Sequence, residues 1–411
     1  MINSIDEALN YLYSKRNNNK DLSRIKKCIK ELNININYKI ILITGTNGKG
    51  STALFLKNIL KNIYHVGCFT SPFVLMFNER IMINDRMISN SEIMHYTSIL
   101  EGLNKWYLNN YNEEIPFFEL TLLMALLYYQ DREIDLGIFE CGIGGLNDSC
   151  NALEPDLSII TSIGYDHMDK LGNTLEEILL NKLGITRNNK PLIYSMEPNS
   201  KLDQIIIDYG NKNNIILNNI YQNVKSINDD YIQKFEYKNN TYETLMHGKY
   251  QPYNAGVAIE AINILYNGFP QIFIEEGIKT TILPGRLEYL SNNPTVILDG
   301  AHNIDAIKMT VDYINKIKKN KRIITLFNCL SNKSYKDMIN ELDNITDLYL
   351  FIDFDDERKT NIDLFVSSTN KKYEILDNIE LIKNYINEDN ILLITGSLHF
   401  ASYIKNLKNL F

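Results

Sequence analysis

The sequence predicts an α/β fold with largely parallel sheets, arranged as two domains. Short apolar runs alternate with segments of helical periodicity along most of the 411 residues, and this alternation is typical of parallel strands joined by helices. At roughly 100–200 residues per domain, the length allows two or three domains. A change of pattern near Pro284 separates a larger first domain from a smaller second one.

The elements expected in the first domain follow the chain in order. Helices are expected over Ser51–Ile63 and over Leu120–Tyr129, the latter a buried segment too short to cross a bilayer. Two alternating stretches between Tyr231 and His247 flank Lys238-Asn239-Asn240 and predict a small antiparallel hairpin. Buried strands are expected at Ile40–Ile43, Leu136–Glu140, Leu157–Ile163 and Leu192–Tyr194.

The second domain begins at the turn signal Leu283-Pro284-Gly285-Arg286. We therefore predict domains over residues 1–284 and 285–411, with an active site between the two α/β lobes. Its strands are expected near Thr295–Leu298, Ile323–Phe327, Leu348–Ile352 and Ile391–Thr395.

The composition excludes several classes of protein. The 42 Lys and Arg residues against 50 Asp and Glu residues give a net charge of −8, which argues against nucleic acid as a partner. The five cysteines are scattered without a Cys-x-x-Cys pair, and the N-terminal residues show no signal peptide. These features favour a reducing cytoplasm, with no membrane anchor and no disulfide framework. An acidic chain that handles anionic substrates needs metals or local cations to do so.

A phosphate-binding loop is predicted after the first strand. The residues there are Gly45-Thr46-Asn47-Gly48-Lys49-Gly50-Ser51, and a helix follows. Glycines let backbone N–H groups converge on a phosphate, the helix N-terminus adds positive potential, and Lys49 reaches the terminal phosphates. The match to the standard pattern is imperfect, because no Gly stands six residues before Lys49 and Gly50 separates it from Ser51. The alternative is a glycine-rich turn between a strand and a helix.

Three polar side chains follow later strands. Glu140 ends a predicted strand and is well placed to hold Mg²⁺ beside a nucleotide. His167 follows the next strand and suggests a second metal or a substrate contact, although a histidine alone is more often structural. Lys182 lies on the helix after that strand, and its alternative role is that of a solvated surface lysine.

Together these segments resemble the folylpolyglutamate synthase/dihydrofolate synthase family within the Mur ligase superfamily. The resemblance covers nearly the whole chain and rests on short motifs in a fixed order. Besides the phosphate loop, the motifs are Thr70-Ser71-Pro72, Phe77-Asn78-Glu79-Arg80-Ile81, Phe117-Phe118-Glu119-Leu120-Thr121, Glu140-Cys141-Gly142-Ile143-Gly144-Gly145, Asp166-His167-Met168-Asp169, Leu171-Gly172-Asn173-Thr174, Lys182-Leu183-Gly184-Ile185, Gln251 with Asn254, Pro284-Gly285-Arg286, Leu298-Asp299-Gly300-Ala301-His302-Asn303 and Thr395-Gly396-Ser397-Leu398. The resemblance implies an N-terminal P-loop-type ATPase domain and a smaller Rossmann-like glutamate-ligase domain, acting as a monomer.

The activity that the resemblance implies is ATP-dependent amide formation. ATP phosphorylates a carboxylate of folate, tetrahydrofolate or folylpolyglutamate, and the amine of L-glutamate attacks the acyl phosphate. An amide forms, and ADP and phosphate leave. Two Mg²⁺ ions are implied, with Ser71, Glu140 and His167 as metal ligands, while Lys182 matches a lysine that is carbamylated in the superfamily.

The implied substrate contacts come from both domains. ATP would contact the phosphate loop and bridge the lobes, so that domain closure assembles the site. Without the resemblance, Asp299-Gly300-Ala301-His302 would be interpreted as a strand–helix turn with an N-cap. The nucleotide contacts implied outside the loop are Asn254, Arg286, Asp299 and His302. The folate contacts implied are Phe73, Phe77, Arg80 and Asp148.

Departures from the family pattern concern the pterin side of the substrate. Phe73 stands where the family often has His, and Leu146-Asn147-Asp148-Ser149-Cys150-Asn151 lacks the usual Arg. We therefore favour glutamate addition to tetrahydrofolates over a bifunctional enzyme that also makes dihydrofolate from dihydropteroate. Two further interpretations stay open, a muropeptide ligase and a nucleotide-gated binding module without ligase activity.

Overall fold

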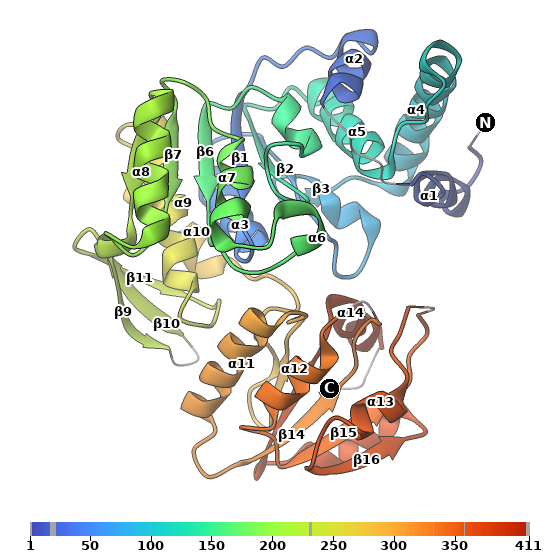
Figure 1. Ribbon diagram of the computed structural model, residues 1–411, viewed down its shortest axis with the longest axis vertical. Coiled ribbons are helices and arrows are strands. Elements are labelled where there is room, and N and C mark those ends of the chain that lie inside the picture. Colours follow the sequence, from blue (N-terminus) through green and yellow to red (C-terminus); the bar gives the residue numbers. More distant parts are fainter. Residues whose placement is uncertain (1, 17–21, 230–231, 332, 357, 408–411) are drawn as a thin grey trace. The chain divides into compact units, whose positions relative to one another are not determined.

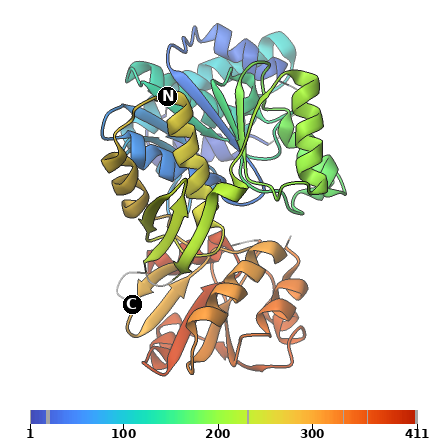
Figure 2. The same cartoon turned by 90° about the vertical axis from the view of Figure 1, so that its left-hand side faces the viewer.

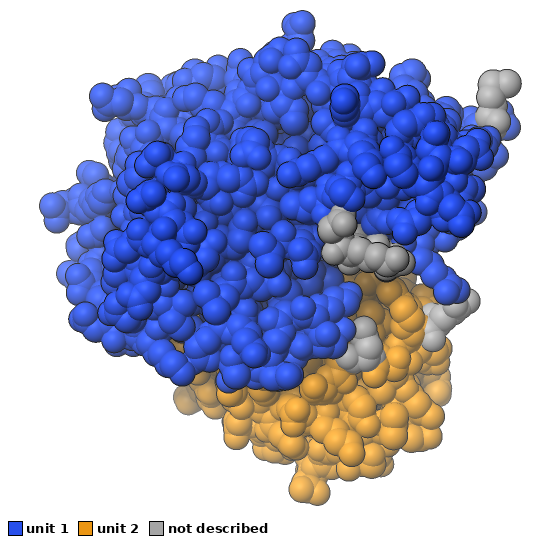
Figure 3. Space-filling view, turned by 45° about the horizontal axis from the view of Figure 1, so that its top comes forward, with its two compact units in different colours: residues 1–225, 236–242, 252–280 blue, residues 226–235, 243–251, 281–411 orange. Residues whose placement is uncertain are grey.

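The structure, a computed structural model, describes residues 2–16, 22–229, 232–331, 333–356 and 358–407. Figure 3 colours its two compact units. Residues 1–225, 236–242 and 252–280 form the first unit, and residues 226–235, 243–251 and 281–411 form the second. The predicted division after residue 284 stays a prediction, because the second unit also contains two short segments that precede residue 281.

The first unit is built on an eight-stranded sheet with the strand order β4-β3-β2-β5-β1-β6-β7-β8. Neighbouring strands from β2 to β8 pair in parallel, whereas β3 and β4 are antiparallel to their neighbours. The strands are β1 (Lys39–Thr44), β2 (Val66–Phe69), β3 (Ile81–Ile83), β4 (Arg86–Met87), β5 (Leu136–Glu140), β6 (Leu157–Ile160), β7 (Pro191–Tyr194) and β8 (Ile216–Asn219). The predicted α/β class and largely parallel sheet are confirmed.

Helices cover both faces of this sheet, which is why its central strands are apolar on both sides. Figure 1 shows α1, α2, α4 and α5 in one group, and Figure 2 shows α8 on one side of the sheet with α9 and α10 on the other. The helices that begin before residue 281 are α1 (Ile5–Tyr13), α2 (Ser23–Glu31), α3 (Lys49–Leu60), α4 (Asn90–Tyr111), α5 (Phe117–Asp131), α6 (Met168–Leu171), α7 (Leu175–Leu183), α8 (Lys201–Asn213), α9 (Gln251–Leu265) and α10 (Gln271–Thr280), with short 3₁₀ helices η1 (Phe77–Arg80), η2 (Ser149–Ala152) and η3 (Tyr221–Asn223).

The predicted hairpin is present in a three-stranded sheet of β9 (Val224–Asp229), β10 (Gln233–Tyr237) and β11 (Asn240–Thr244). Lys238 and Asn239 join β10 to β11 with φ angles of 46° and 67°. Two successive residues with positive φ are typical of a type I′ turn, whose twist matches that of the flanking strands. Tyr231, where the prediction began, lies outside the described residues.

The second unit contains a six-stranded sheet with the order β12-β13-β17-β14-β15-β16. All neighbours pair in parallel except β12 with β13. The strands are β12 (Glu288–Ser291), β13 (Thr295–Leu298), β14 (Arg322–Phe327), β15 (Leu348–Ile352), β16 (Lys372–Leu376) and β17 (Asn390–Thr395), and the helices are α11 (Ile304–Ile317), α12 (Tyr335–Leu342), α13 (Ile362–Val366), η4 (Ile379–Tyr385) and α14 (Leu398–Asn406). The four strands predicted here are confirmed.

Two predicted boundaries are wrong for physical reasons. The strand expected over residues 157–163 ends at Ile160, because Thr161 and Ser162 turn to bond the neighbouring loop instead of continuing the ladder. The helix expected over residues 51–63 begins at Lys49, because the left-handed Gly48 serves as its N-cap, and it ends at Leu60. Among the described residues, no helix combines the length and hydropathy that a bilayer crossing requires.

Two glycines inside helices of the first unit should respond oppositely to substitution by Ala. A Cβ at Gly277 on α10 would lie 2.5 Å from the Ile59 Cα on α3, whereas a Cβ at Gly102 on α4 would meet nothing within 4 Å. We expect Gly277→Ala to lower the free energy of unfolding by about 1–3 kcal/mol and Gly102→Ala to raise it by up to about 1 kcal/mol. Urea titrations followed by the fluorescence of Trp106, the chain's one tryptophan, measure both changes. Equal effects of the two substitutions would contradict this packing.

Candidate active site

The predicted phosphate loop connects β1 to α3 and is packed too tightly for any residue but glycine at two positions. Gly48 has φ of 90°, and a Cβ there would lie 2.4 Å from the Asn254 Oδ1. A Cβ at Gly45 would lie 1.9 Å from the Thr161 Oγ1. The structure therefore places Asn254, on α9, against the loop, while its implied contact with the nucleotide stays a prediction.

Residues that sequence reasoning missed hold this loop in place. The Ser162 hydroxyl accepts the Asn47 N–H at 2.9 Å, and the Thr161 hydroxyl donates to the Asn47 carbonyl at 2.7 Å. The Thr46 N–H donates to the Ser162 carbonyl at 2.8 Å. Two hydroxyl residues directly after a buried strand were the available signal. These bonds fix the loop before any ligand arrives.

Lys49 holds its ammonium group over the loop. Its Nζ donates to the Gly45 carbonyl at 3.0 Å and to the Thr46 carbonyl at 3.3 Å. Ser51, in the first turn of α3, is buried. A phosphate in the loop would meet this ammonium group as well as the N-terminus of α3.

Glu140 and Ser71, two of the predicted metal ligands, lie together. Glu140 ends β5, is 4% exposed, and its Oε2 accepts the backbone N–H of Ser71 at 3.0 Å. Ser71 follows β2, which pairs in parallel with β5. In the part of the chain that the structure describes, no three His, Cys, Asp or Glu side chains gather closely enough to hold a metal. A buried carboxylate next to a serine residue fits a hard cation that takes its remaining ligands from phosphates and water.

Lys182 is 3% exposed on α7, so its interpretation as a solvated surface lysine is wrong. Burial, together with the positive charge of Lys49, lowers the pKa of Lys182 to about 7. The helix is held beside the loop after β5, because the Asn181 Oδ1 accepts the Gly145 N–H at 3.0 Å. At neutral pH this amine is therefore substantially uncharged.

His167 lies on the loop after β6 with φ of 49°, where it precedes the short helix α6. Its side chain is 40% exposed, and its Nε2 lies 3.8 Å from the Asp166 Oδ2. The negative charge of Asp166 in turn acts on Lys182. His167 therefore lies next to a carboxylate, Asp166, whose charge acts on Lys182.

Arg80 lies in an aromatic cluster, which we define as Tyr13, Phe73, Phe77 and Phe117. Its guanidinium carbon lies 5.2 Å from the centre of the Phe73 ring and 5.4 Å from that of Phe117. Arg80 is 8% exposed, burial lowers its pKa, and its Nε has no hydrogen-bond partner within the described residues. The Tyr13 ring stacks on Phe117 at 5.3 Å, with 49% of the residue exposed. Sequence reasoning missed Tyr13, which no motif contains.

Asp148 shapes the loop after β5. Its buried carboxylate accepts backbone N–H bonds from Gly142 at 2.8 Å, Ile143 at 3.0 Å and Cys150 at 3.0 Å. Burial raises the pKa of Asp148 despite these bonds. Its predicted contact with folate stays a prediction, and the observed bonds make it a brace for the segment that follows Glu140.

The predicted nucleotide residues of the second unit surround the turn before β12 and the end of β13. The Asp299 carboxylate accepts the Leu287 N–H at 3.3 Å and a short bond from the Thr310 hydroxyl, and the charge of Arg286 acts on it. His302 Nδ1 lies 3.1 Å from the Gly300 carbonyl. The N-cap of α11 is Asn303, which accepts the Ala306 N–H at 2.8 Å, so residues 299–302 form the strand–helix turn that precedes this cap.

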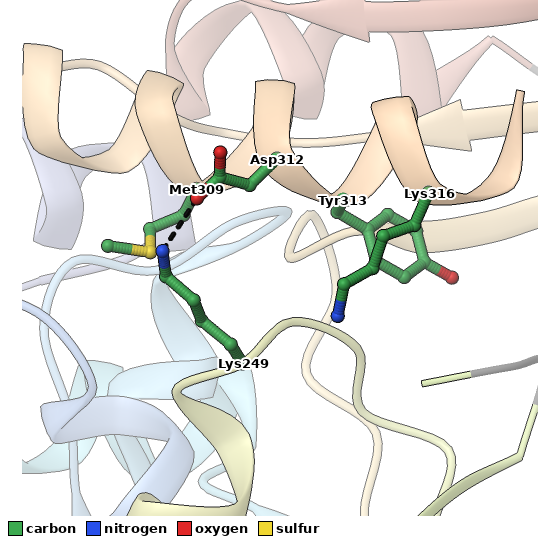
Figure 4. A pocket seen from close by; sticks show the side chains of 5 residues that line it. All are labelled: Lys249, Met309, Asp312, Tyr313 and Lys316. Carbon is green, nitrogen blue, oxygen red and sulfur yellow. Dashed lines mark hydrogen bonds and ion pairs between the residues drawn. The ribbon is translucent and has the colours of Figure 1, made fainter. Parts of the chain in front are cut away.

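A recess of about 230 Å³ in the second unit lies apart from every predicted residue. Lys249 bonds Asp312 of α11 at 2.6 Å across it, and Tyr313 and Lys316 project from the same helix (Figure 4). Both partners of that ion pair are about half exposed. The Lys249–Asp312 pair is therefore an exposed ion pair, which contributes little to stability.

Comparison with known proteins identifies the class. Residues 43–262 match the Mur ligase middle domain, and residues 285–398 match the Mur ligase glutamate ligase domain. The chain is therefore a ligase of the Mur type. A dihydrofolate synthase/folylpolyglutamate synthase of Bacillus subtilis is 33% identical over 88% of this chain and 89% of its own length. The chain belongs to the folylpolyglutamate synthase/dihydrofolate synthase family.

Solved structures show the same fold. The folylpolyglutamate synthase of Thermotoga maritima matches with a TM-score of 0.87 and 28% identity, covering 98% of this chain and 96% of that one. FolC of E. coli, solved with DHPP and ADP, matches with a TM-score of 0.86 and 24% identity over 98% and 97% of the two chains. A bifunctional folylpolyglutamate synthase/dihydrofolate synthase, 23% identical with a TM-score of 0.83 over 98% and 97% of the two chains, was solved with Mn, AMPPNP and L-glutamate.

Proposed function

We propose that the chain adds L-glutamate to the γ-carboxylate of tetrahydrofolate or folylpolyglutamate through an acyl phosphate, releasing ADP and phosphate. The observation that carries this proposal is the composition of the edge where β1, β5 and β6 end. That edge combines a phosphate loop with Lys49, a buried Glu140 beside Ser71, and a buried Lys182 of lowered pKa. Such a set suits transfer of a phosphoryl group to a carboxylate.

In the proposed reaction, a γ-carboxylate oxygen of the folate attacks the terminal phosphorus of ATP, and the bond to ADP breaks. The amine of glutamate then attacks the acyl carbon, the amide forms, and phosphate leaves with the former carboxylate oxygen. Lys49 and the loop amides bind the phosphates, with Asn254 beside them. Arg286, Asp299 and His302 are the nucleotide contacts we propose for the second unit, where the planar guanidinium group of Arg286 suits a phosphate.

We assign Ser71, Glu140 and His167 as ligands of Mg²⁺, with two ions per site. The oxygen ligands suit Mg²⁺, which keeps several waters and binds through one or two carboxylates and substrate phosphates. When bound, the metal offsets the negative charge that develops on the transferring phosphoryl group. Ser71 and Glu140 orient the site through the hydrogen bond that joins them.

Lys182 is proposed to carry a carbamate. Carbamylation joins an uncharged amine to CO₂ and releases a proton, so it requires the neutral form of the lysine. With its pKa lowered to about 7, Lys182 supplies that form at neutral pH. The product is an anion beside the positive charge of Lys49, which attracts it and so favours the carbamate over the free amine.

The aromatic cluster around Arg80 is proposed to bind the folate, through Phe73, Phe77 and Arg80, with Asp148 as a further contact. Flat rings stack on aromatic faces, and a buried guanidinium group with a free Nε–H suits an anionic or carbonyl oxygen of the ligand. A bifunctional enzyme that also accepts dihydropteroate is the second candidate, because the Bacillus subtilis relative carries both names.

The remaining assignments follow from composition. The net charge of −8 and the absence of cysteine pairing among the described residues, where all five thiols are buried, support a cytoplasmic enzyme without nucleic-acid partners. That the enzyme acts as a monomer is proposed from the family resemblance alone. Its partners would be ATP, folate polyglutamates and L-glutamate.

Incubation with ATP, Mg²⁺ and labelled amino acid tests the proposal, with tetrahydrofolate, dihydropteroate and a UDP-muropeptide offered in parallel. We expect labelled amide with tetrahydrofolate, and about a hundredfold less with Lys49→Met, which removes the ammonium group from the phosphate site. Product with the muropeptide alone would replace the proposal by a muropeptide ligase. If no acceptor gave a product, the result would favour the interpretation as a nucleotide-gated binding module without ligase activity.

Removal of the lysine amine tests the carbamate. Lys182→Ala should lose at least about 99% of the activity and regain part of it with added acetate or formate, which substitute for the missing carboxylate. Lys201→Ala is the matched control, because Lys201 is 78% exposed and should be dispensable. Full activity of Lys182→Ala, or loss without recovery in carboxylate, would overturn the carbamate.

A further inference from the structure

A buried ion pair links two helices of the first unit outside the groups described so far. Arg24, on α2, donates from Nε and Nη2 to the two carboxylate oxygens of Glu119, on α5, at 2.9 Å each. Arg24 is 6% exposed and Glu119 1%. Such a bidentate pair fixes both the distance and the angle between its partners.

Glu119 lies in the first turn of α5, directly after Phe117 and Phe118. Phe117 belongs to the aromatic cluster, with its ring 6.3 Å from Phe77 and 5.4 Å from the Arg80 guanidinium carbon. Gly142 follows Glu140 by two residues. A Cβ placed on Gly142 would lie 3.1 Å from the Phe118 ring. The turn that the ion pair holds therefore contacts both the proposed folate site and the loop after β5.

The segment that leads into this turn is held from other helices as well. The Asn104 Oδ1 on α4 accepts the Ile115 N–H at 2.7 Å, inside the protein. Tyr13, on α1, stacks on Phe117. Helices α1, α2 and α4 thus hold the first turn of α5 and the segment before it. The contact from α2 is made by Arg24.

A buried ion pair is a weak source of stability, because the loss of hydration offsets most of the attraction, and a pair of apolar side chains would stabilise the turn as well. What the pair adds is a fixed geometry. We propose that Arg24 and Glu119 are positioning residues for the folate, which act by holding Phe117 against Arg80. This inference rests on the proposed function.

Conservative variants with steady-state kinetics and hydrogen exchange test the proposal. Arg24→Lys keeps the charge but cannot form the fork, and Glu119→Gln keeps the shape but loses the charge. For folded Arg24→Lys we expect the KM for tetrahydrofolate to rise about tenfold, with the KM for ATP changed less than about twofold. Amide exchange should rise in residues 113–123 and stay unchanged in α7. Arg132→Lys is the matched control, since Arg132 pairs with Glu92 at 2.7 Å with its side chain 46% exposed.

Each result decides the question. An unchanged KM for tetrahydrofolate in folded Arg24→Lys, or equal rises in both KM values, would overturn the positioning role, as would the same change in Arg132→Lys. If Glu119→Gln does not fold, Arg24→Lys carries the test. If the wild-type chain forms no amide at all, the proposed function fails, and the exchange of residues 113–123 still shows whether Arg24 holds the turn. Unchanged exchange there would overturn the inference by itself.

Discussion

Close packing of the loop backbone against the Thr161 and Asn254 side chains, at the end of β1, is the constraint on which the candidate site depends. At Gly45 and Gly48, the phosphate loop approaches Thr161 and Asn254 more closely than any Cβ allows. The loop can therefore lie directly on the segment after β6, whose hydroxyl groups bond Asn47. A parallel sheet makes this possible, because the carboxyl ends of neighbouring strands meet at one edge. The same edge brings Ser71 to Glu140 and Asn181 to the loop after β5.

The charges at this edge explain how an acidic chain can bind anionic substrates. The net charge of −8 is the total for the whole chain, whereas Lys49, Arg80 and Lys182 lie near one set of strand ends. Burial makes a positive charge on Lys182 unfavourable, and the nearby charge of Lys49 adds to this, so the pKa of Lys182 is lowered. A nearby anion, whether a phosphate or a carbamate, stabilises these positive charges. The arrangement therefore favours bound ligand over the empty site.

Much of this architecture was predictable from sequence. Ile40–Ile43 and Leu348–Ile352 are uninterrupted apolar runs, and burial on both faces of a parallel sheet produces such runs. The strand β16 has four exposed residues in five and therefore lacks the pattern. Thr161 and Ser162 were assigned to a strand because periodicity does not show that their hydroxyls bond a loop more than a hundred residues away. Tyr13 contacts the aromatic cluster through the packing of α1, and Arg24 contacts Glu119 through the packing of α2; no local sequence pattern reports either contact. The burial of Lys182 depends on tertiary contacts, so only the resemblance pointed to it.

The central claim is that a carboxylate of the folate is activated as an acyl phosphate. The most direct measurement uses tetrahydrofolate labelled with ¹⁸O in its γ-carboxylate, incubated with the chain, ATP, Mg²⁺ and L-glutamate, with the released phosphate analysed by mass spectrometry. The account predicts one ¹⁸O atom in phosphate for each amide formed, because the attacking carboxylate oxygen leaves with the phosphoryl group. Amide formation with unlabelled phosphate would contradict it.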